Sequence, residues 1–148
     1  NHVLIGSEDP ECDELEYVDD PDDYNKSFTD QWKTQVIREA QRLEGLPIPE
    51  KSQGLVSLYD ASDDWLPIYD MSDLPGFYMA IGTSGNQYKN APIAGVLMGE
   101  LIKAVESGRN HDEDPVSFQM KYTGRTCNID FFSRNREINP DSSFSVIG

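Results

Sequence analysis

Residues 76–108, GFYMAIGTSGNQYKNAPIAGVLMGELIKAVESG, contain the pattern that decides the fold. The short apolar run at 77–81 predicts a β-strand, and the glycine-bearing residues 82–90 predict a loop. Residues from Ala91 to about Ser107 predict a helix, because apolar side chains recur there at helical spacing. A strand, a glycine loop and a helix in this order can point backbone N–H groups and the positive end of a helix at a ligand.

The expected helix has recognisable ends. Asn90 is a suitable N-cap, and Pro92 lies in the first turn, where a missing N–H costs little. Gly108 follows the helix as a C′ residue. Inside the helix, Gly95 and Gly99 lie four residues apart and would let another backbone pack closely, since helix propensity alone does not favour glycine there.

Residues 58–102, LYDASDDWLPIYDMSDLPGFYMAIGTSGNQYKNAPIAGVLMGELI, resemble the C-terminal signature of FAD-dependent oxidoreductases of the D-amino-acid oxidase and sarcosine oxidase superfamily. That family reads aspartate, an aromatic or polar residue, P-I-I/L-G, then GLY-A-G-x-S-G-H-G-F-K-x-A-P and a helix. Two positions depart from it. The family's histidine-glycine-phenylalanine is Asn86-Gln87-Tyr88 here, and Ser57 stands where some sarcosine oxidases carry a cysteine bonded to the flavin. No covalent flavin link is therefore expected at this position.

The resemblance implies an α+β fold that forms the C-terminal part of a two-domain flavoenzyme. Residues 1–75 would supply part of the antiparallel sheet of the substrate domain, residues 76–108 the closing strand, loop and helix of the FAD-binding domain, and residues 109–148 a tail. The G-x-G-x-x-G fingerprint is missing, because no two glycines are spaced two apart. The rest of the FAD-binding unit is therefore expected upstream in the same protein, and these residues alone are expected to be inactive.

The implied activity is oxidation of an amine or amino acid, sarcosine- or glycine-like, by hydride transfer to FAD. The loop amides of residues 84–86 and the helix start would stabilise negative charge on the flavin, although a plain strand-to-helix turn is the alternative. Lys89 aligns with a loop lysine that binds the substrate carboxylate in some members, and Tyr59 with an active-site aromatic residue. An ordinary exposed lysine and a half-buried tyrosine are equally good interpretations of these two. The cofactor-binding residues implied by the resemblance are Gly82, Thr83, Ser84, Gly85, Asn86, Gln87, Tyr88 and Lys89.

The remaining chain predicts one more helix and several short strands. Apolar residues at helical spacing predict a helix from Ser27 to Leu43, with Ser27 as its cap. Residues 133–148 predict a polar tail that packs on a surface. Segments with β-compatible composition are expected at 2–6, 54–60, 65–69, 116–122 and 127–132.

Composition argues against several classes of function. The net charge is −15, and ten of the sixteen residues from Glu8 to Asp23 are acidic, whereas nucleic-acid binding needs clustered Lys and Arg. The two histidines, His2 and His111, and the two cysteines lack the spacing of a metal site. No apolar run approaches the roughly 18 residues of a membrane-spanning helix, and no signal-peptide pattern is present, so a cytoplasmic location is expected.

A second function class stays open. The acidic residues 8–23 lack the spacing of an EF-hand, and they are typical of a solvated loop. They could also form the surface of a stand-alone interaction domain without catalysis. An upstream G-x-G-x-x-G after a strand would favour the flavoenzyme, and its absence would favour the interaction domain.

Overall fold

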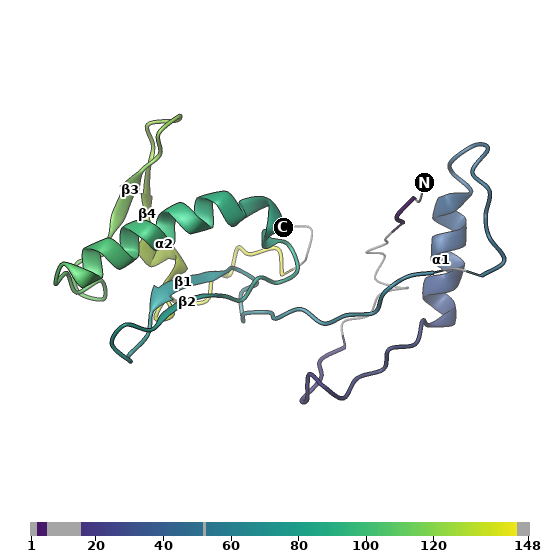
Figure 1. The fold of residues 1–148 in the computed structure, drawn as a ribbon, viewed down its shortest axis with the longest axis horizontal. Helices are drawn as coiled ribbons and strands as arrows, with labels where there is room; N and C mark the ends of the chain where they lie inside the picture. Colours follow the sequence, from purple (N-terminus) through teal and green to yellow (C-terminus); the bar gives the residue numbers. More distant parts are fainter. Residues whose placement is uncertain (1–2, 6–15, 52, 145–148) are drawn as a thin grey trace. The chain divides into compact units, whose positions relative to one another are not determined.

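A computed structural model describes residues 3–5, 16–51 and 53–144. These residues form a small α+β fold with two α-helices and two two-stranded antiparallel sheets (Figure 1). The chain divides into two compact units, residues 1–58 and 59–148. In order, the elements are α1 (Asp30–Ala40), β1 (Ile68–Met71), β2 (Tyr78–Ile81), the 3₁₀ helix η1 (Gln87–Asn90), α2 (Ala91–Glu106), β3 (Ser117–Gln119), β4 (Thr126–Asn128) and the 3₁₀ helix η2 (Ile129–Phe132).

The first unit contains α1 and an aromatic cluster. The cap of α1 is Thr29, whose hydroxyl oxygen accepts a hydrogen bond from the Trp32 N–H at 3.0 Å, so Ser27 is not the cap. The rings of Phe28 and Trp32 stack with their centroids 4.3 Å apart. A Cβ on Gly54 would lie 3.1 Å from the Trp32 ring, so the chain after the helix passes directly over these rings. The helix was correctly expected, but it is shorter at both ends.

Two segments expected as strands are not strands. Residues 3–5 and 53–61 have no regular secondary structure, and residues 2 and 6 lie outside the described part of the chain. Leu55 is 86% exposed, and the Tyr24 hydroxyl donates to the Val56 carbonyl at 3.5 Å in an isolated contact. β-Compatible side chains did not suffice here, because a strand also needs a partner backbone in register.

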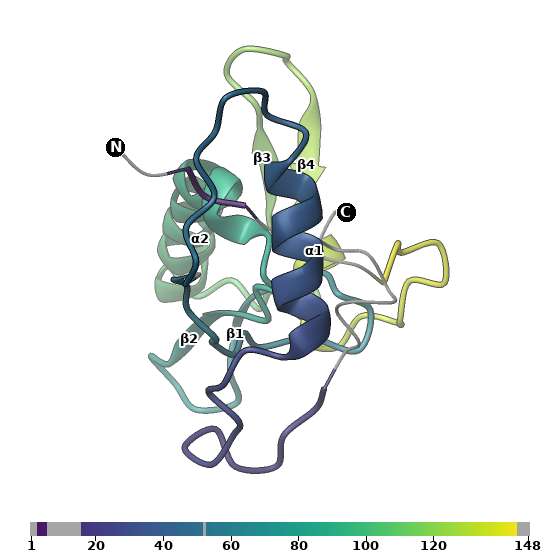
Figure 2. The same ribbon diagram turned by 90° about the vertical axis from the view of Figure 1, so that its right-hand side faces the viewer.

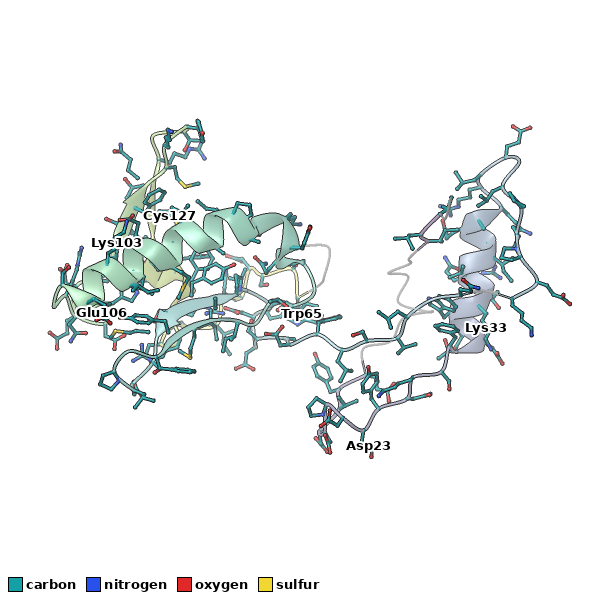
Figure 3. All side chains as sticks on the ribbon, viewed as in Figure 1. Asp23, Lys33, Trp65, Lys103, Glu106 and Cys127 are labelled. Atoms are coloured by element: carbon teal, nitrogen blue, oxygen red, sulfur yellow. The ribbon has the colours of Figure 1, made fainter. Side chains whose placement is uncertain are left out.

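The second unit is built on the β1–β2 hairpin and α2. Ile68 pairs with Ile81 and Met71 with Tyr78, and α2 lies along this hairpin in both views (Figures 1 and 2). At the far end of α2, the Tyr78 hydroxyl donates to Glu106 Oε1 at 2.7 Å, and Figure 3 labels this glutamate. The helix therefore covers one face of the hairpin. The buried core beneath it consists of Tyr69, Leu97, Leu101, Val116 and Ile129.

The two ends of α2 differ in how well the sequence predicted them. At its start, η1 runs directly into the helix; Asn90 stands at the expected N-cap position, but it has helical backbone angles and its side chain makes no capping hydrogen bond. At its end, Gly108 has φ +95° and donates to the Val105 carbonyl, while the Arg109 N–H donates to the Ala104 carbonyl at 3.1 Å. This pair of bonds is a Schellman motif, which confirms Gly108 as the residue that ends the helix.

A second hairpin, β3–β4, follows α2, and η2 follows the hairpin. Phe118 pairs with Cys127 in this ladder. The extended segment expected at 127–132 ends at Asn128, because Ile129 turns into η2 and is fully buried in the core. Within the described residues, no helix is both long and apolar enough to cross a membrane.

Candidate functional site

The glycine loop, residues 82–86, has an unusual backbone. Three residues have left-handed φ angles: Gly82 at +67°, Ser84 at +48° and Gly85 at +75°. For a residue with a side chain, such an angle costs about 1–3 kcal/mol and persists only when the surroundings impose it. Ser84 is fully buried. The loop conformation is therefore fixed by its contacts, which lie mainly on residues 59–62.

Asp60 makes most of these contacts. One carboxylate oxygen accepts from the Gly82 N–H, and the other accepts from the Thr83 N–H at 3.1 Å and the Thr83 hydroxyl at 2.6 Å. The Asp60 main-chain carbonyl accepts from the Ser84 N–H at 2.8 Å. Burial raises the pKa of Asp60, but the hydrogen bonds from Thr83 and Gly82 outweigh it and hold the pKa below its ordinary value.

These bonds change which loop amides are available to a ligand. The sequence suggested the N–H groups of residues 84–86 as donors to a flavin. The Ser84 N–H is bonded to Asp60, and the Asn86 N–H donates to the Thr83 carbonyl at 3.1 Å. The Gly85 N–H has no hydrogen-bond acceptor among the described residues. Of the three suggested donors, only this one is unpaired within the described structure.

The structure brings the predicted residue Tyr59 to this loop. A Cβ on Gly85 would lie 3.3 Å from the Tyr59 ring, and a Cβ on Gly82 would lie 3.3 Å from Ser62 Cβ. Because Gly82 and Gly85 have no side chains, Ser62 and Tyr59 can pack closely against the loop backbone. The Tyr59 ring is also edge-to-face with Trp65 at 6.1 Å and is 45% exposed, so it supports the loop from one side.

The residues after the loop are tied to the core by one glutamine. Gln87 Oε1 accepts from the Tyr69 hydroxyl at 3.3 Å and from the Asn90 side-chain amide at 2.9 Å, while its own amide donates to Asn86. Tyr88 is 97% exposed. Lys89 is exposed, and its side chain has no hydrogen bond or ion pair within the described ranges. Its ammonium group is therefore available to an anion near the start of α2.

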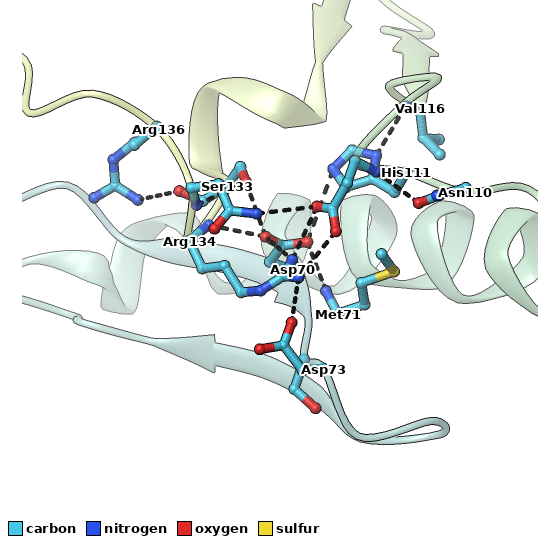
Figure 4. A network of polar contacts seen from close by, with 12 residues as sticks. Asp70, Met71, Asp73, Asn110, His111, Val116, Ser133, Arg134 and Arg136 are labelled. Atoms are coloured by element: carbon cyan, nitrogen blue, oxygen red, sulfur yellow. Dashed lines mark hydrogen bonds and ion pairs between the residues drawn. The ribbon is translucent and has the colours of Figure 1, made fainter.

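A second polar cluster, the Asp70 network, lies at the other end of β1 (Figure 4). Asp70 is fully buried, and its Oδ2 accepts from the Ser133 hydroxyl at 3.0 Å, from the Arg134 N–H at 2.8 Å and from the Arg134 guanidinium at 3.1 Å. Its Oδ1 accepts from the Met71 N–H at 2.7 Å. Both oxygens of this carboxylate therefore accept hydrogen bonds from the protein.

Arg134 connects this buried carboxylate to two exposed ones. Its guanidinium donates to both oxygens of Asp112, at 3.0 and 2.9 Å, and to Asp73 at 2.7 Å. The hydrogen bonds to Asp112 outweigh burial and raise the pKa of Arg134, and the same bonds lower the pKa of Asp112. One arginine therefore holds the tail against β1 and against the segment after α2.

His111 lies beside Asp70 but does not complete a catalytic arrangement. It is buried, its Nδ1 accepts from the Val116 N–H at 3.0 Å, and its Nε2 lies 3.9 Å from Asp70 Oδ1 with no hydrogen-bond partner among the described residues. A neutral ring with an accepting Nδ1 carries its proton on Nε2. The Ser133 hydroxyl is bonded to Asp70 rather than to His111, so His111 is not placed to act as a base on it.

A third pair closes the tail onto the turn before β1. Arg136 donates to both oxygens of Asp64, at 2.9 and 2.6 Å, and to the Leu66 carbonyl at 2.9 Å. The hydrogen bond from Arg136 holds the pKa of Asp64 well below its ordinary value despite burial. Across the described part of the chain, no group of three or more His, Cys, Asp or Glu side chains is arranged to hold a metal ion.

Sequence reasoning missed both of these arginines and their aspartates. It also passed over Asp60, because a single aspartate before a turn carries no distinctive pattern. One signal was available: Asp70 stands inside an otherwise apolar strand, and a charged residue in such a place is rarely buried without a partner. The two arginines also stand out in the C-terminal part of a strongly acidic chain.

Comparisons with protein-family models, with curated proteins and with solved structures give no match for this chain.

Proposed function

We propose that this chain is the C-terminal portion of an FAD-dependent oxidoreductase that oxidises an amine or amino acid, sarcosine- or glycine-like. The proposal rests on the resemblance of residues 58–102 to that family. One structural observation supports it: a rigid loop between β2 and α2 leaves the Gly85 N–H without an acceptor among the described residues. A fixed donor near the start of a helix suits the carbonyl edge of a flavin.

The residues of the loop fit this role in a restricted way. The Gly85 N–H and the start of α2 would stabilise negative charge on the flavin, while Gly82, Thr83 and Ser84 would hold that donor in place through Asp60. Asn86, Gln87 and Tyr88 replace the family's histidine-glycine-phenylalanine, and the exposed Tyr88 side chain is free to lie against a cofactor. The flavin itself would accept the hydride equivalent from the substrate. The segment that binds its adenosine and pyrophosphate would come from upstream in the same protein.

Two side chains are proposed to act around the substrate. Lys89, whose ammonium group has no partner among the described residues, would bind the substrate carboxylate, since a charge-assisted hydrogen bond both orients and anchors an amino acid. The other is Tyr59, whose half-exposed ring packs against Gly85 and would line the space next to the loop. Neither group would take the substrate's hydride; both would position the reacting carbon.

The test is the absorbance spectrum of the protein made from the longest open reading frame that contains this sequence, purified without added cofactor. Flavin bands that bleach on anaerobic addition of amines or amino acids would support the proposal, and a panel of such compounds would identify the substrate class. A folded protein that is colourless and stays so after incubation with FAD would overturn it.

Residues 1–148 alone sharpen this test. They are expected to bind FAD weakly, because the contacts to adenosine and pyrophosphate are supplied elsewhere, and tight binding would contradict the proposal. If FAD binds neither form, the alternative is an interaction domain that uses the acidic residues 8–23. Of these, the structure describes residues 16–23, which have no helix or strand and are mostly exposed.

A further inference from the structure

We infer that Asp60 is the positioning residue of the proposed flavin site: its carboxylate sets the conformation of the glycine loop and so presents the Gly85 N–H. The inference rests on the proposed function for the identity of the ligand. The part that concerns the loop stands on the structure alone and is tested separately below.

The first support is the number of contacts that one residue makes. Three consecutive loop residues, Gly82, Thr83 and Ser84, donate four hydrogen bonds to Asp60, three to its carboxylate and one to its carbonyl. An ionised carboxylate has only acceptor sites, so both of its oxygens can accept N–H and O–H donors at once. An asparagine in its place would turn an NH₂ group toward one of these donors and lose at least one bond.

The second support is the backbone that these bonds hold. Ser84 keeps a left-handed φ of +48° in a fully buried position, between two glycines that are also left-handed. Such a conformation persists only where neighbours over-determine it. The Ser84 hydroxyl lies 3.4 Å from the Gly82 carbonyl, at the limit of a hydrogen bond, so it cannot supply this restraint by itself. The contacts to Asp60 are the ones that do.

The third support is that Asp60 is itself anchored. Its neighbour Tyr59 packs against Gly85, and Ser62 packs against Gly82 while its hydroxyl donates to the Leu66 carbonyl at 2.6 Å. The segment before β1 therefore contacts both glycines of the loop. Asp60 lies between the two contacting residues, Tyr59 and Ser62, in the sequence. A group fixed in this way can hold a ligand-binding amide in place without touching the ligand.

The first experiment measures the loop without cofactor. Asp60→Asn is compared with Asp63→Asn, which makes the same charge change at an exposed aspartate three residues away. Hydrogen–deuterium exchange of the cofactor-free protein, read by mass spectrometry on peptides covering 82–86, is expected to be roughly tenfold faster in Asp60→Asn and unchanged in Asp63→Asn. Equal exchange in the two variants would overturn the inference. If Asp60→Asn does not fold, Thr83→Val replaces it, because this change removes one of the carboxylate's donors and keeps the backbone.

The second experiment places the same substitutions in the protein made from the longest open reading frame, adds FAD to its cofactor-free form and follows flavin fluorescence. Asp60→Asn is expected to bind FAD roughly tenfold more weakly, with a shifted flavin absorbance spectrum, whereas Asp63→Asn binds like the unaltered protein. Faster loop exchange with unchanged FAD affinity and spectrum would overturn the link to the cofactor. If the unaltered protein binds no FAD, the proposed function fails, while the exchange result still decides whether Asp60 sets the loop.

Discussion

Two aspartates on either side of the start of β1 organise the second unit, and they do so in different ways. Asp70 is enclosed: it is fully buried, its carboxylate accepts hydrogen bonds from Ser133 and Arg134, and the Arg134 guanidinium neutralises it. Asp60 holds a loop whose next residue, Gly85, keeps an N–H with no acceptor in the described structure. A closed network serves stability, whereas a rigid loop with an unused donor can serve binding. Substitutions at the two places should separate these roles.

The largest loss of stability is expected when Asp70 loses its cation. Arg134→Met would leave a carboxylate buried without a charged partner, and breaking such a pair costs about 3–5 kcal/mol. The free energy of unfolding, measured by urea titration and tryptophan fluorescence, is the readout. Arg109→Met is the matched control, because the Arg109–Asp114 pair is exposed and is worth about 0–1 kcal/mol. Similar losses of unfolding free energy in both variants would show that the buried Asp70–Arg134 pair stabilises the fold no more than an exposed pair does.

The second largest effect on stability is expected from acid, which should weaken the ion pairs Arg136–Asp64 and Arg134–Asp112. Hydrogen bonds from Arg136 and Arg134 hold the pKa values of Asp64 and Asp112 below their ordinary value. A carboxyl with a lowered folded pKa stabilises the fold above its unfolded pKa, near 3.9, and this contribution is lost as pH falls through the folded pKa. The urea midpoint is therefore expected to fall as the pH is lowered below about 4.

Asp64→Asn identifies the source of that acid sensitivity. This variant is expected to be less stable near neutral pH and to lose less further stability on acidification, because its main titrating contact is already gone. Asp63→Asn, at the adjacent exposed position, should keep the full pH dependence. An Asp64→Asn protein that loses as much stability in acid as the unaltered protein would assign the effect elsewhere.

A smaller effect on stability is expected in the glycine loop. Gly85→Ala would place a Cβ at φ +75°, 3.3 Å from the Tyr59 ring, and should cost about 1–2 kcal/mol. Gly95→Ala is the control: it lies in α2 with open space around the added Cβ, and alanine there should stabilise the helix by about 0.5–1 kcal/mol. Thermal unfolding followed by circular dichroism should show a lower melting temperature for Gly85→Ala and a higher one for Gly95→Ala. Equal effects would mean that the loop backbone is not constrained.

What the sequence could predict follows from how local each feature is. The strand, loop and helix at 76–108 and the end of α2 at Gly108 were predictable, because periodicity and a glycine C′ are read from neighbouring residues. The strand expected at 54–60 fails because pairing depends on a distant backbone. The bond between Asp70 and Arg134 joins residues 64 apart, and no local pattern announces it. The hydrogen bonds between Asp60 and the glycine loop were missed for the same reason.

The smallest change in stability, and the sharpest test of the proposed role, is expected at Lys89. Its side chain is exposed and makes no hydrogen bond or ion pair within the described residues, so Lys89→Met should change the free energy of unfolding by less than about 0.5 kcal/mol. If it binds the substrate carboxylate, kcat/KM for a carboxylate-bearing amine should fall about tenfold or more, and the decarboxylated analogue should be oxidised equally well by both forms. Lys103→Met, which removes a lysine that pairs with Glu100 on the surface of α2, should leave kcat/KM unchanged.

Because stability and activity are expected to move apart at Lys89 and together at Arg134, measuring both in both variants separates a binding group from a structural one. An unchanged kcat/KM in Lys89→Met would remove Lys89 from the proposed site and leave the loop amide as its remaining polar contact.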